Sequence, residues 1–144
     1  MPDTLSITEF RKAAGPRFSD AVHGHRPIPI ERGSRDRGLL LGNDEVMLLV
    51  AGKDFSPEVF MGTGELVSIW LPEFELYGEG ESFDVAKADL LDEVRAYIEE
   101  YVASIDEYLH APNRVSHFPY LIKAWMADLD GELEQVLFAP PSEA

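Results

Sequence analysis

The fold of the first third of the chain is set by residues 5–41, which read LSITEFRKAAGPRFSDAVHGHRPIPIERGSRDRGLLL. Within this stretch Thr8 is a favourable N-cap, and apolar residues then recur at helical spacing as far as Val22. Gly15-Pro16 interrupts that pattern, so a kink or a break is expected there. Gly24, between two histidines, is a natural C-cap. The stretch therefore predicts a helix that ends at a histidine-rich turn.

A β-hairpin is expected after this helix. Pro27-Ile28-Pro29-Ile30-Glu31-Arg32 reads as a strand, and its two prolines place it at the edge of a sheet. Residues 33–38 are turn-like, and Leu39-Leu40-Leu41 reads as the returning strand. A short helix capped by Asn43 or Asp44 should follow.

The rest of the chain reads as strands followed by helices. Residues 51–65 contain recurrent Gly and Pro, which favours a connecting loop and makes this segment the candidate domain boundary. Residues 66–71 and 74–77 are rich in β-forming side chains, and Gly78-Glu79-Gly80 reads as a turn before a cap at Ser82.

Helices are predicted over residues 84–109 and 120–129, while the pattern of 133–138 fits a helix and a strand equally. The first of these helices carries one apolar stripe, made of Leu90, Leu91, Val94, Tyr97, Ile98, Tyr101, Val102, Ile105 and Leu109.

Charge is divided unevenly along the 144 residues. Twelve Lys and Arg residues oppose 27 Asp and Glu residues, for a formal net charge of −15. Residues 1–42 carry seven basic and five acidic residues, a net +2, whereas residues 43–144 carry five basic and 22 acidic residues, a net −17. A mildly basic N-terminal segment followed by a strongly acidic remainder indicates two partners of opposite charge. The alternative is an acidic chain that happens to contain a near-neutral patch.

The composition excludes several classes of protein. Without cysteine the chain has no disulfide scaffold, thiolate zinc site or cysteine nucleophile. No apolar run approaches the roughly 20 residues that span a bilayer, and the N-terminus does not read as a signal peptide. We therefore expect a soluble cytoplasmic protein with no membrane partner.

No catalytic constellation stands out in the sequence. His23 and His25 could grip a metal from a strand, but no third ligand is evident, and a turn with surface histidines is the alternative. Glu99-Glu100 could serve as an acid–base pair, yet adjacent helical residues face different directions, which favours a solvated face. A phosphate-binding glycine loop and a nucleophile elbow are both missing. We expect no enzyme, metal site or cofactor.

Four features of the first third occur in a distinctive order. They are Ile7-Thr8-Glu9-Phe10-Arg11, a helix ending in His-Gly-His, Pro29-Ile30-Glu31-Arg32 and Gly38-Leu39-Leu40-Leu41. Together, over residues 5–50, they resemble the Phd/YefM family of antitoxins. The resemblance implies a fold that dimerises, binds operator DNA and represses its own operon, with a C-terminal part that wraps and inhibits a partner toxin.

The resemblance also implies DNA contacts at five basic residues. Arg11 matches the Arg of the family's Thr-Glu-x-Arg motif, and Arg32 matches the Arg that closes the Pro-Ile-Glu-Arg strand. Arginine suits this role because its guanidinium binds phosphate oxygens and can fork onto a guanine edge. Lys12, Arg35 and Arg37 could add contacts to the DNA backbone. The alternative is that an arginine pairs with a neighbouring acid on a solvated surface, namely Glu9, Asp20 or Glu31.

The second half departs from this family. We expect this half to fold by itself, because it contains strands, a long amphipathic helix, two Trp and five Tyr. The corresponding tail in the family is often short and disordered. A strand through Trp70, the Gly78-Glu79-Gly80-Glu81-Ser82 turn and a helix from Asp84 are similar to HicB antitoxins; a plain α+β module is the alternative. Several aromatic residues could anchor a basic toxin or lie in the core: Trp70, Tyr77, Tyr97, Tyr101, Trp125 and Phe138.

The sequence thus predicts an α+β protein in two parts. Residues 1–50 form a Phd/YefM-like DNA-binding and dimerisation domain, residues 51–65 a linker, and residues 66–144 an acidic, strand–helix, toxin-binding module. The expected function is that of a type II antitoxin that binds a basic toxin protein directly, forms a homodimer or higher oligomer and autorepresses its operon. The alternatives are an acidic dimeric protein–protein adaptor that does not bind DNA, and a small hydrolase.

Overall fold

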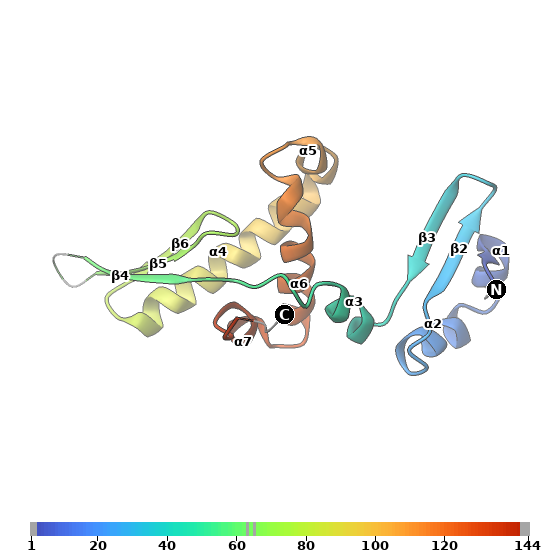
Figure 1. Cartoon of the computed structure of the whole chain (residues 1–144), viewed down its shortest axis with the longest axis horizontal. Helices are drawn as coiled ribbons and strands as arrows, with labels where there is room; N and C mark the ends of the chain where they lie inside the picture. The colour runs from blue at the N-terminus through green and yellow to red at the C-terminus, as the bar shows by residue number, and fades with distance from the viewer. Residues whose placement is uncertain (1–2, 63, 65, 142–144) are drawn as a thin grey trace. The chain divides into compact units, whose positions relative to one another are not determined.

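A computed structural model describes residues 3–62, 64 and 66–141 of the chain. It divides the chain into two compact units, Met1–Leu49 and Val50–Ala144, each with its own three-stranded sheet (Figure 1). The predicted α+β class is confirmed, since each unit combines a small sheet with helices. No helix among the described residues is long and apolar enough to cross a membrane.

The first unit packs two short helices against its sheet. Its elements are β1 (Leu5–Ser6), α1 (Ile7–Lys12), α2 (Ala14–Val22), β2 (Ile28–Arg32), β3 (Asp36–Leu40) and α3 (Asn43–Leu49). Strand β2 lies in the middle, parallel to β1 and antiparallel to β3. A small core of Leu5, Ala21 and Ile28, with Phe10 packed against it, joins the helices to the sheet.

Helix α1 begins earlier than the sequence indicates, because Ser6 and not Thr8 is its N-cap. The Ser6 hydroxyl accepts the Glu9 N–H at 3.1 Å, and the Glu9 carboxylate accepts the Ser6 N–H at 3.1 Å. This reciprocal capping box satisfies two backbone donors at once. The hydrogen bonds from Ser6, first that of its backbone N–H, hold the pKa of Glu9 below its usual range.

The break in the first helical region falls at Ala13, before the Gly15-Pro16 pair where it is expected. Pro16 lies in the first turn of α2, where the helix needs no N–H donor. A proline ring clashes with the carbonyl four residues earlier, which here belongs to Lys12, and α1 ends at that residue. The proline thus displaces the break toward the N-terminus.

The prediction that the strand of residues 27–32 lies at a sheet edge is wrong, since β2 is the central strand. Strand β1 is only two residues long and pairs with Ile30 and Glu31. Pro29 pairs with Leu39 of β3 but lies outside the β1 ladder, so its missing N–H removes no hydrogen bond to β1. The returning strand β3 also begins three residues earlier than predicted, at Asp36.

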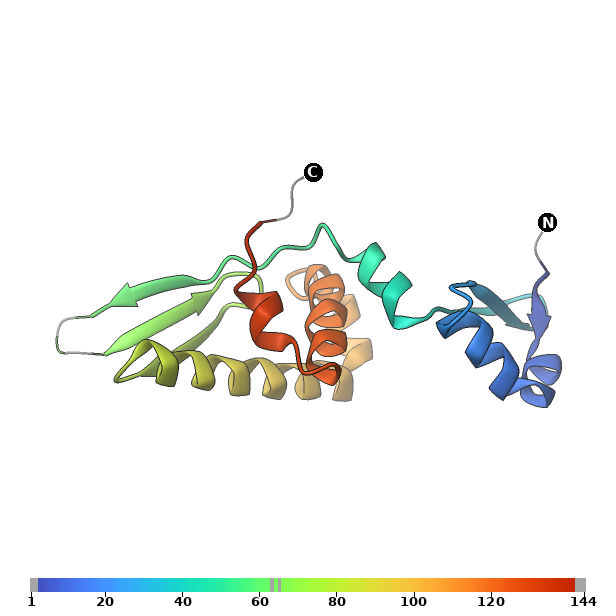
Figure 2. The ribbon, with the colours of Figure 1, turned by 90° about the horizontal axis from the view of Figure 1, so that it is seen from below.

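The second unit packs a long helix against one face of an antiparallel sheet. Its elements are β4 (Glu58–Met61), β5 (Val67–Leu71), β6 (Leu76–Gly80), α4 (Phe83–Ala103), α5 (Ile105–His110), the 3-10 turn η1 (Val115–His117), α6 (Phe118–Leu129) and α7 (Leu133–Leu137). Helix α4 packs on β5 and β6. Strand β4 is the edge strand farther from this helix (Figure 2). Helices α6 and α7 complete the core, which includes Ile69, Leu90, Tyr101, Leu121 and Leu133.

The strands of the second unit differ from the sequence-based expectation in two places. Residues 51–65, read as a connecting loop, contain β4, and residues 78–80, read as a turn, lie in β6. The chain instead reverses at residues 72–75, where Glu75 has φ 56°. A Cβ at Gly78 would lie 2.6 Å from the Cβ of Leu90, so this glycine permits α4 to approach the sheet closely.

The helix predicted over 84–109 is two helices, α4 and α5, which meet at Ser104. The break brings the ring of Tyr108 onto that of Tyr101, with centroids 4.8 Å apart. Val102 and Leu109, placed in the apolar stripe by the sequence, are exposed. Of residues 133–138, whose pattern fits a helix and a strand equally, Leu133–Leu137 form α7.

Candidate functional site

The five basic residues expected to contact DNA lie on two parts of the first unit. Arg11 and Lys12 occupy the last turn of α1, whereas Arg32, Arg35 and Arg37 lie at the end of the β2–β3 hairpin. All five are exposed. Among the described residues, Arg11 and Arg35 make no ion pair, so their guanidinium groups are available to a ligand.

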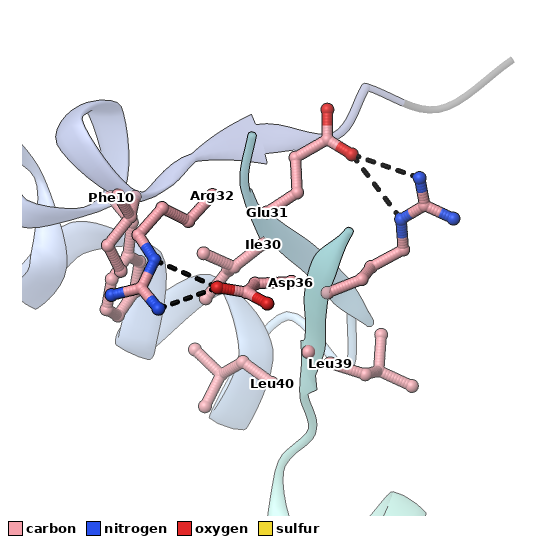
Figure 3. A pocket seen from close by; sticks show the side chains of 10 residues that line it. Phe10, Ile30, Glu31, Arg32, Asp36, Leu39 and Leu40 are labelled. Atoms are coloured by element: carbon pink, nitrogen blue, oxygen red, sulfur yellow. Dashed lines mark hydrogen bonds and ion pairs between the residues drawn. The ribbon is translucent and has the colours of Figure 1, made fainter. Parts of the chain in front are cut away.

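Two of the hairpin arginines are ion-paired across the hairpin (Figure 3). Arg32 Nη2 lies 2.6 Å from Asp36 Oδ2, and Arg37 Nη2 lies 3.3 Å from Glu31 Oε2. Arg32 faces Asp36 in one cross-strand pair and Arg37 faces Glu31 in the next, so the two ion pairs lie on opposite faces of the hairpin. Exposed pairs of this kind contribute at most about 1 kcal/mol, so either arginine can exchange its carboxylate for a phosphate.

An apolar groove of about 510 Å³ lies beside the Arg32–Asp36 pair. Ile7 and Phe10 of α1 line it together with Ile30 and Leu40 of the hairpin. Figure 3 shows Phe10, Ile30 and Leu40 on one side of the hairpin and Leu39 on the other. The groove and the exposed Leu39 leave apolar surface of the first unit uncovered.

The sheet of the second unit has one face that none of the described helices covers. Cross-strand pairing aligns Glu58 with Trp70 and Tyr77 in one row, and Phe60 with Ser68 and Glu79 in the next. These six residues are called the open face below. Alternate residues such as Ile69 and Gly78 point to the other face and are buried against α4. The rings of Trp70 and Tyr77 lie 4.4 Å apart, which gives the open face an aromatic centre flanked by carboxylates.

Every basic side chain of the second unit already interacts within that unit. Lys53 lies over the ring of Tyr120, Lys87 pairs with Glu134, Arg95 with Asp128, Arg114 donates to the Tyr97 hydroxyl, and Lys123 donates to the carbonyls of Ala51 and Lys53. Within the described part of the chain, the carboxylates of Glu58 and Glu79 have no ion pair. The open face is therefore acidic without internal compensation.

The aromatic residues singled out in the sequence fall into two groups. Tyr97 and Tyr101 are buried, and Trp125 and Phe138 pack against the same core, so these four stabilise the fold. Trp70 and Tyr77 lie on the open face. Sequence reasoning missed Val59, Phe60 and Met61, because the glycines and prolines around them indicated a loop, although their β-forming side chains favoured a strand.

The histidines form no metal centre within the described residues, which hold no group of three or more His, Cys, Asp or Glu side chains able to bind an ion. His25 Nδ1 instead lies 2.6 Å from Glu45 Oε1 and joins the turn after α2 to α3. His117 is buried, and its Nδ1 lies 2.6 Å from the Tyr97 hydroxyl. Burial and, second, the charge of Arg114 lower the pKa of His117 below its usual range.

Comparison with known proteins gives one family and one fold. A family model of PHD-like proteins, described as antitoxins of RelE/RelB toxin–antitoxin systems, matches residues 1–139. A crystal structure titled as an antitoxin part of a toxin/antitoxin system from Syntrophomonas wolfei subsp. wolfei matches with a TM-score of 0.77 and 22% sequence identity, covering 98% of this chain and 100% of that one. The comparison with curated proteins gave no match.

These matches extend the resemblance seen in the sequence. The family model covers nearly the whole chain and not only the first third, and the similar structure shares both small sheets and their helices. The family is one of antitoxins, which confirms the prediction that the chain is not an enzyme. The chain belongs to the PHD-like family of antitoxins of toxin–antitoxin systems.

Proposed function

We propose that this antitoxin has two activities, one on each unit. The first unit forms a homodimer that binds operator DNA and represses its own operon, and the second unit neutralises a basic toxin by binding it directly, as in type II systems. The observation that carries this proposal is the division of charge. The seven basic and seven acidic residues of Met1–Leu49 cancel, so the whole net charge of −15 lies on Val50–Ala144.

The arginines of the first unit support the DNA-binding half of the proposal. All five basic residues are exposed: Arg11 and Lys12 on α1, and Arg32, Arg35 and Arg37 on the hairpin. Because Arg32 and Arg37 face opposite sides of the hairpin, one copy cannot present both to the same groove. A dimer, formed over the apolar groove around Phe10 and Leu40, would place two hairpins on successive parts of the operator.

The second unit supports the toxin-binding half. Its excess of carboxylates repels DNA but attracts a basic protein and speeds the encounter with it. Its three antiparallel strands followed by a long helix also agree with the likeness to HicB antitoxins, in which such a fold blocks a toxin.

DNA binding is tested by a gel shift with the antitoxin's own promoter. We expect Arg11→Ala and Arg32→Ala each to weaken binding by roughly fivefold to a hundredfold, since a lost phosphate or base contact is worth about 1–3 kcal/mol. Arg26→Ala is the matched control, because it removes an exposed arginine of the same unit from outside the proposed surface. Equal, weak binding by wild type and all three variants would favour the adaptor that does not bind DNA.

Toxin neutralisation is tested by co-expression with the adjacent gene of the operon. The product of that gene should arrest growth when expressed alone and should be harmless when the antitoxin is co-expressed. If the product is harmless by itself, the second half of the proposal fails whatever the gel shift shows.

A further inference from the structure

Strand β4 is an exposed edge of the second sheet. Val59, Phe60 and Met61 are 47%, 51% and 76% exposed, so the strand is uncovered on both of its faces. At the opposite edge of the sheet, the outward N–H of Glu79 on β6 is already bonded, since it donates to Asp89 Oδ2 of α4 at 2.9 Å. Exposed apolar edge strands pair readily with other chains, and natural proteins usually cover or charge them.

The pairing register shows which backbone groups of β4 face outward. The Gly62 N–H donates to the Leu66 carbonyl at 3.0 Å, which makes these two residues a hydrogen-bonded pair. Hydrogen-bonded and non-bonded pairs alternate along an antiparallel ladder, so Phe60 also bonds to β5, while Val59 and Met61 do not. The N–H and C=O groups of Val59 and Met61 therefore point to the open edge. The same alternation explains the outward N–H of Glu79 on β6.

The two faces beside this edge differ in chemistry. On one side lies the open face, where Glu58 and Phe60 of β4 adjoin Trp70 and Tyr77. On the other side, Val59 and Met61 continue the apolar row of buried Ile69 and Val67 beyond the reach of α4. Side chains of a strand added at β4 would point alternately to the two faces. Those on one face would contact acids and aromatic rings, and those on the other would contact aliphatic side chains.

We propose that β4 receives an extended basic segment of the toxin as a fourth strand of the sheet. Alternate Lys or Arg side chains of that segment lie over the open face, beside Glu58 and the aromatic rings, and its apolar side chains pack on Val59 and Met61. The proposal rests on the toxin-binding role of the second unit. Charge disfavours a second copy of this chain as the occupant, since each second unit carries −15.

The test uses proline to remove an outward donor from β4. Val59→Pro and Met61→Pro delete an N–H that makes no bond to β5, so the sheet itself keeps its ladder. We expect each full-length variant to bind the purified product of the adjacent gene at least roughly tenfold more weakly than wild type, because a carbonyl of the added strand loses its partner. Val59→Thr is the matched control, since it keeps the N–H and a β-branched side chain.

A second measurement on the wild type needs no variant. In the complex, hydrogen exchange at the Val59 and Met61 amides should slow at least tenfold, whereas the amide of Phe60, already bonded to β5, should change less. Far-UV circular dichroism of the proline variants checks that they are folded.

The outcomes separate this inference from the proposed function. If the gene product binds wild type and both proline variants equally, with the Val59 and Met61 amides unprotected, the edge is not the binding site although the toxin-binding role stands. If the product does not bind the wild type, both proposals fail. If the proline variants instead change the oligomeric state of the antitoxin alone, β4 is a contact between copies and the inference is overturned.

Discussion

At the scale of single residues, His117 shows how a polar group is satisfied inside the second core. The Tyr97 hydroxyl accepts a hydrogen bond from Arg114 Nη1 at 3.1 Å and lies 2.6 Å from His117 Nδ1. The Tyr97 oxygen can donate to an unprotonated Nδ1 or accept from a protonated one through its second lone pair, so burial and the charge of Arg114, not this hydrogen bond, are what disfavour the imidazolium. Protonation would place a second cation near Arg114 in a buried site.

This arrangement predicts a loss of stability in mild acid. Burial lowers the pKa of His117 in the folded state, so the unfolded chain binds a proton more readily. The stability due to neutral His117 is therefore fully present above its unfolded pKa of about 6.5 and is lost as the pH falls through that value toward the folded pKa. We expect the melting temperature of the wild type to fall between about pH 7 and pH 5, and His117→Asn to flatten that fall.

The matched control for this prediction is His110→Asn, because His110 is exposed at the end of α5. It should melt with the pH dependence of the wild type. Glu75 is the nearby acid that opposes the shift, so thermal melts of Glu75→Gln should show a larger acid effect than wild type. An unchanged pH slope in His117→Asn would show that His117 does not sense pH in this core.

At the scale of elements, the β2–β3 hairpin holds three of the arginines proposed to bind DNA, together with two acids that pair with Arg32 and Arg37. Asp36 binds Arg32 at 2.6 Å while leaving both side chains exposed. Asp36→Asn should therefore free the guanidinium and remove a charge that repels phosphate. We expect gel shifts to show promoter binding up to about fivefold tighter, the worth of one exposed ion pair.

A double variant tests whether the gain in affinity comes from Arg32 being freed from Asp36. Asp36→Asn together with Arg32→Ala should bind no better than Arg32→Ala alone. Asp20→Asn, which removes a carboxylate from Arg17 of the same unit, serves as the control and should change affinity less. Weaker promoter binding by Asp36→Asn would mean that the ion pair holds the hairpin in its binding conformation.

The same elements show where sequence patterns decide structure and where they do not. The hairpin, α3 and the buried stripe of α4 could be predicted because each depends on local turn residues or on one helical period. Three errors came from reading Gly and Pro as signals for loops, turns and sheet edges, and two of them involve Pro29 and Gly78. Pro29 sits in a central strand because β1 is short, and Gly78 sits in a strand because α4 packs over it. Both are facts of tertiary packing that no local pattern contains.

The candidate sites likewise differ in whether a local sequence pattern reveals them. Arg11 and Arg32 could be chosen from the sequence through short motifs. The open face could not, because it brings together Phe60, Trp70 and Glu79 from three strands whose register is unknown before folding. Strand β4 itself lay within a segment read as a linker, since glycines and prolines flank its four residues.

At the scale of the whole molecule, the two charge patterns predict two independent responses to salt. Promoter binding should weaken with salt, with a slope near −1 for each phosphate contact, and Arg11→Ala should reduce that slope by about one. Association with the adjacent gene product should slow with salt because carboxylates of the second unit steer the encounter. Replacing Glu58 and Glu79 together by Gln should slow that association by roughly two- to fivefold.

Independence of the two surfaces is the decisive part of this prediction. Stopped-flow mixing measures the toxin association rate, and salt titration of the gel shift measures the promoter slope. The paired Gln variant should leave the promoter slope unchanged, because its substitutions lie in the second unit, and Arg11→Ala should leave the association rate unchanged, because Arg11 lies in the first. If either variant moves both quantities together, one surface serves both partners, and toxin and operator would then compete for the antitoxin.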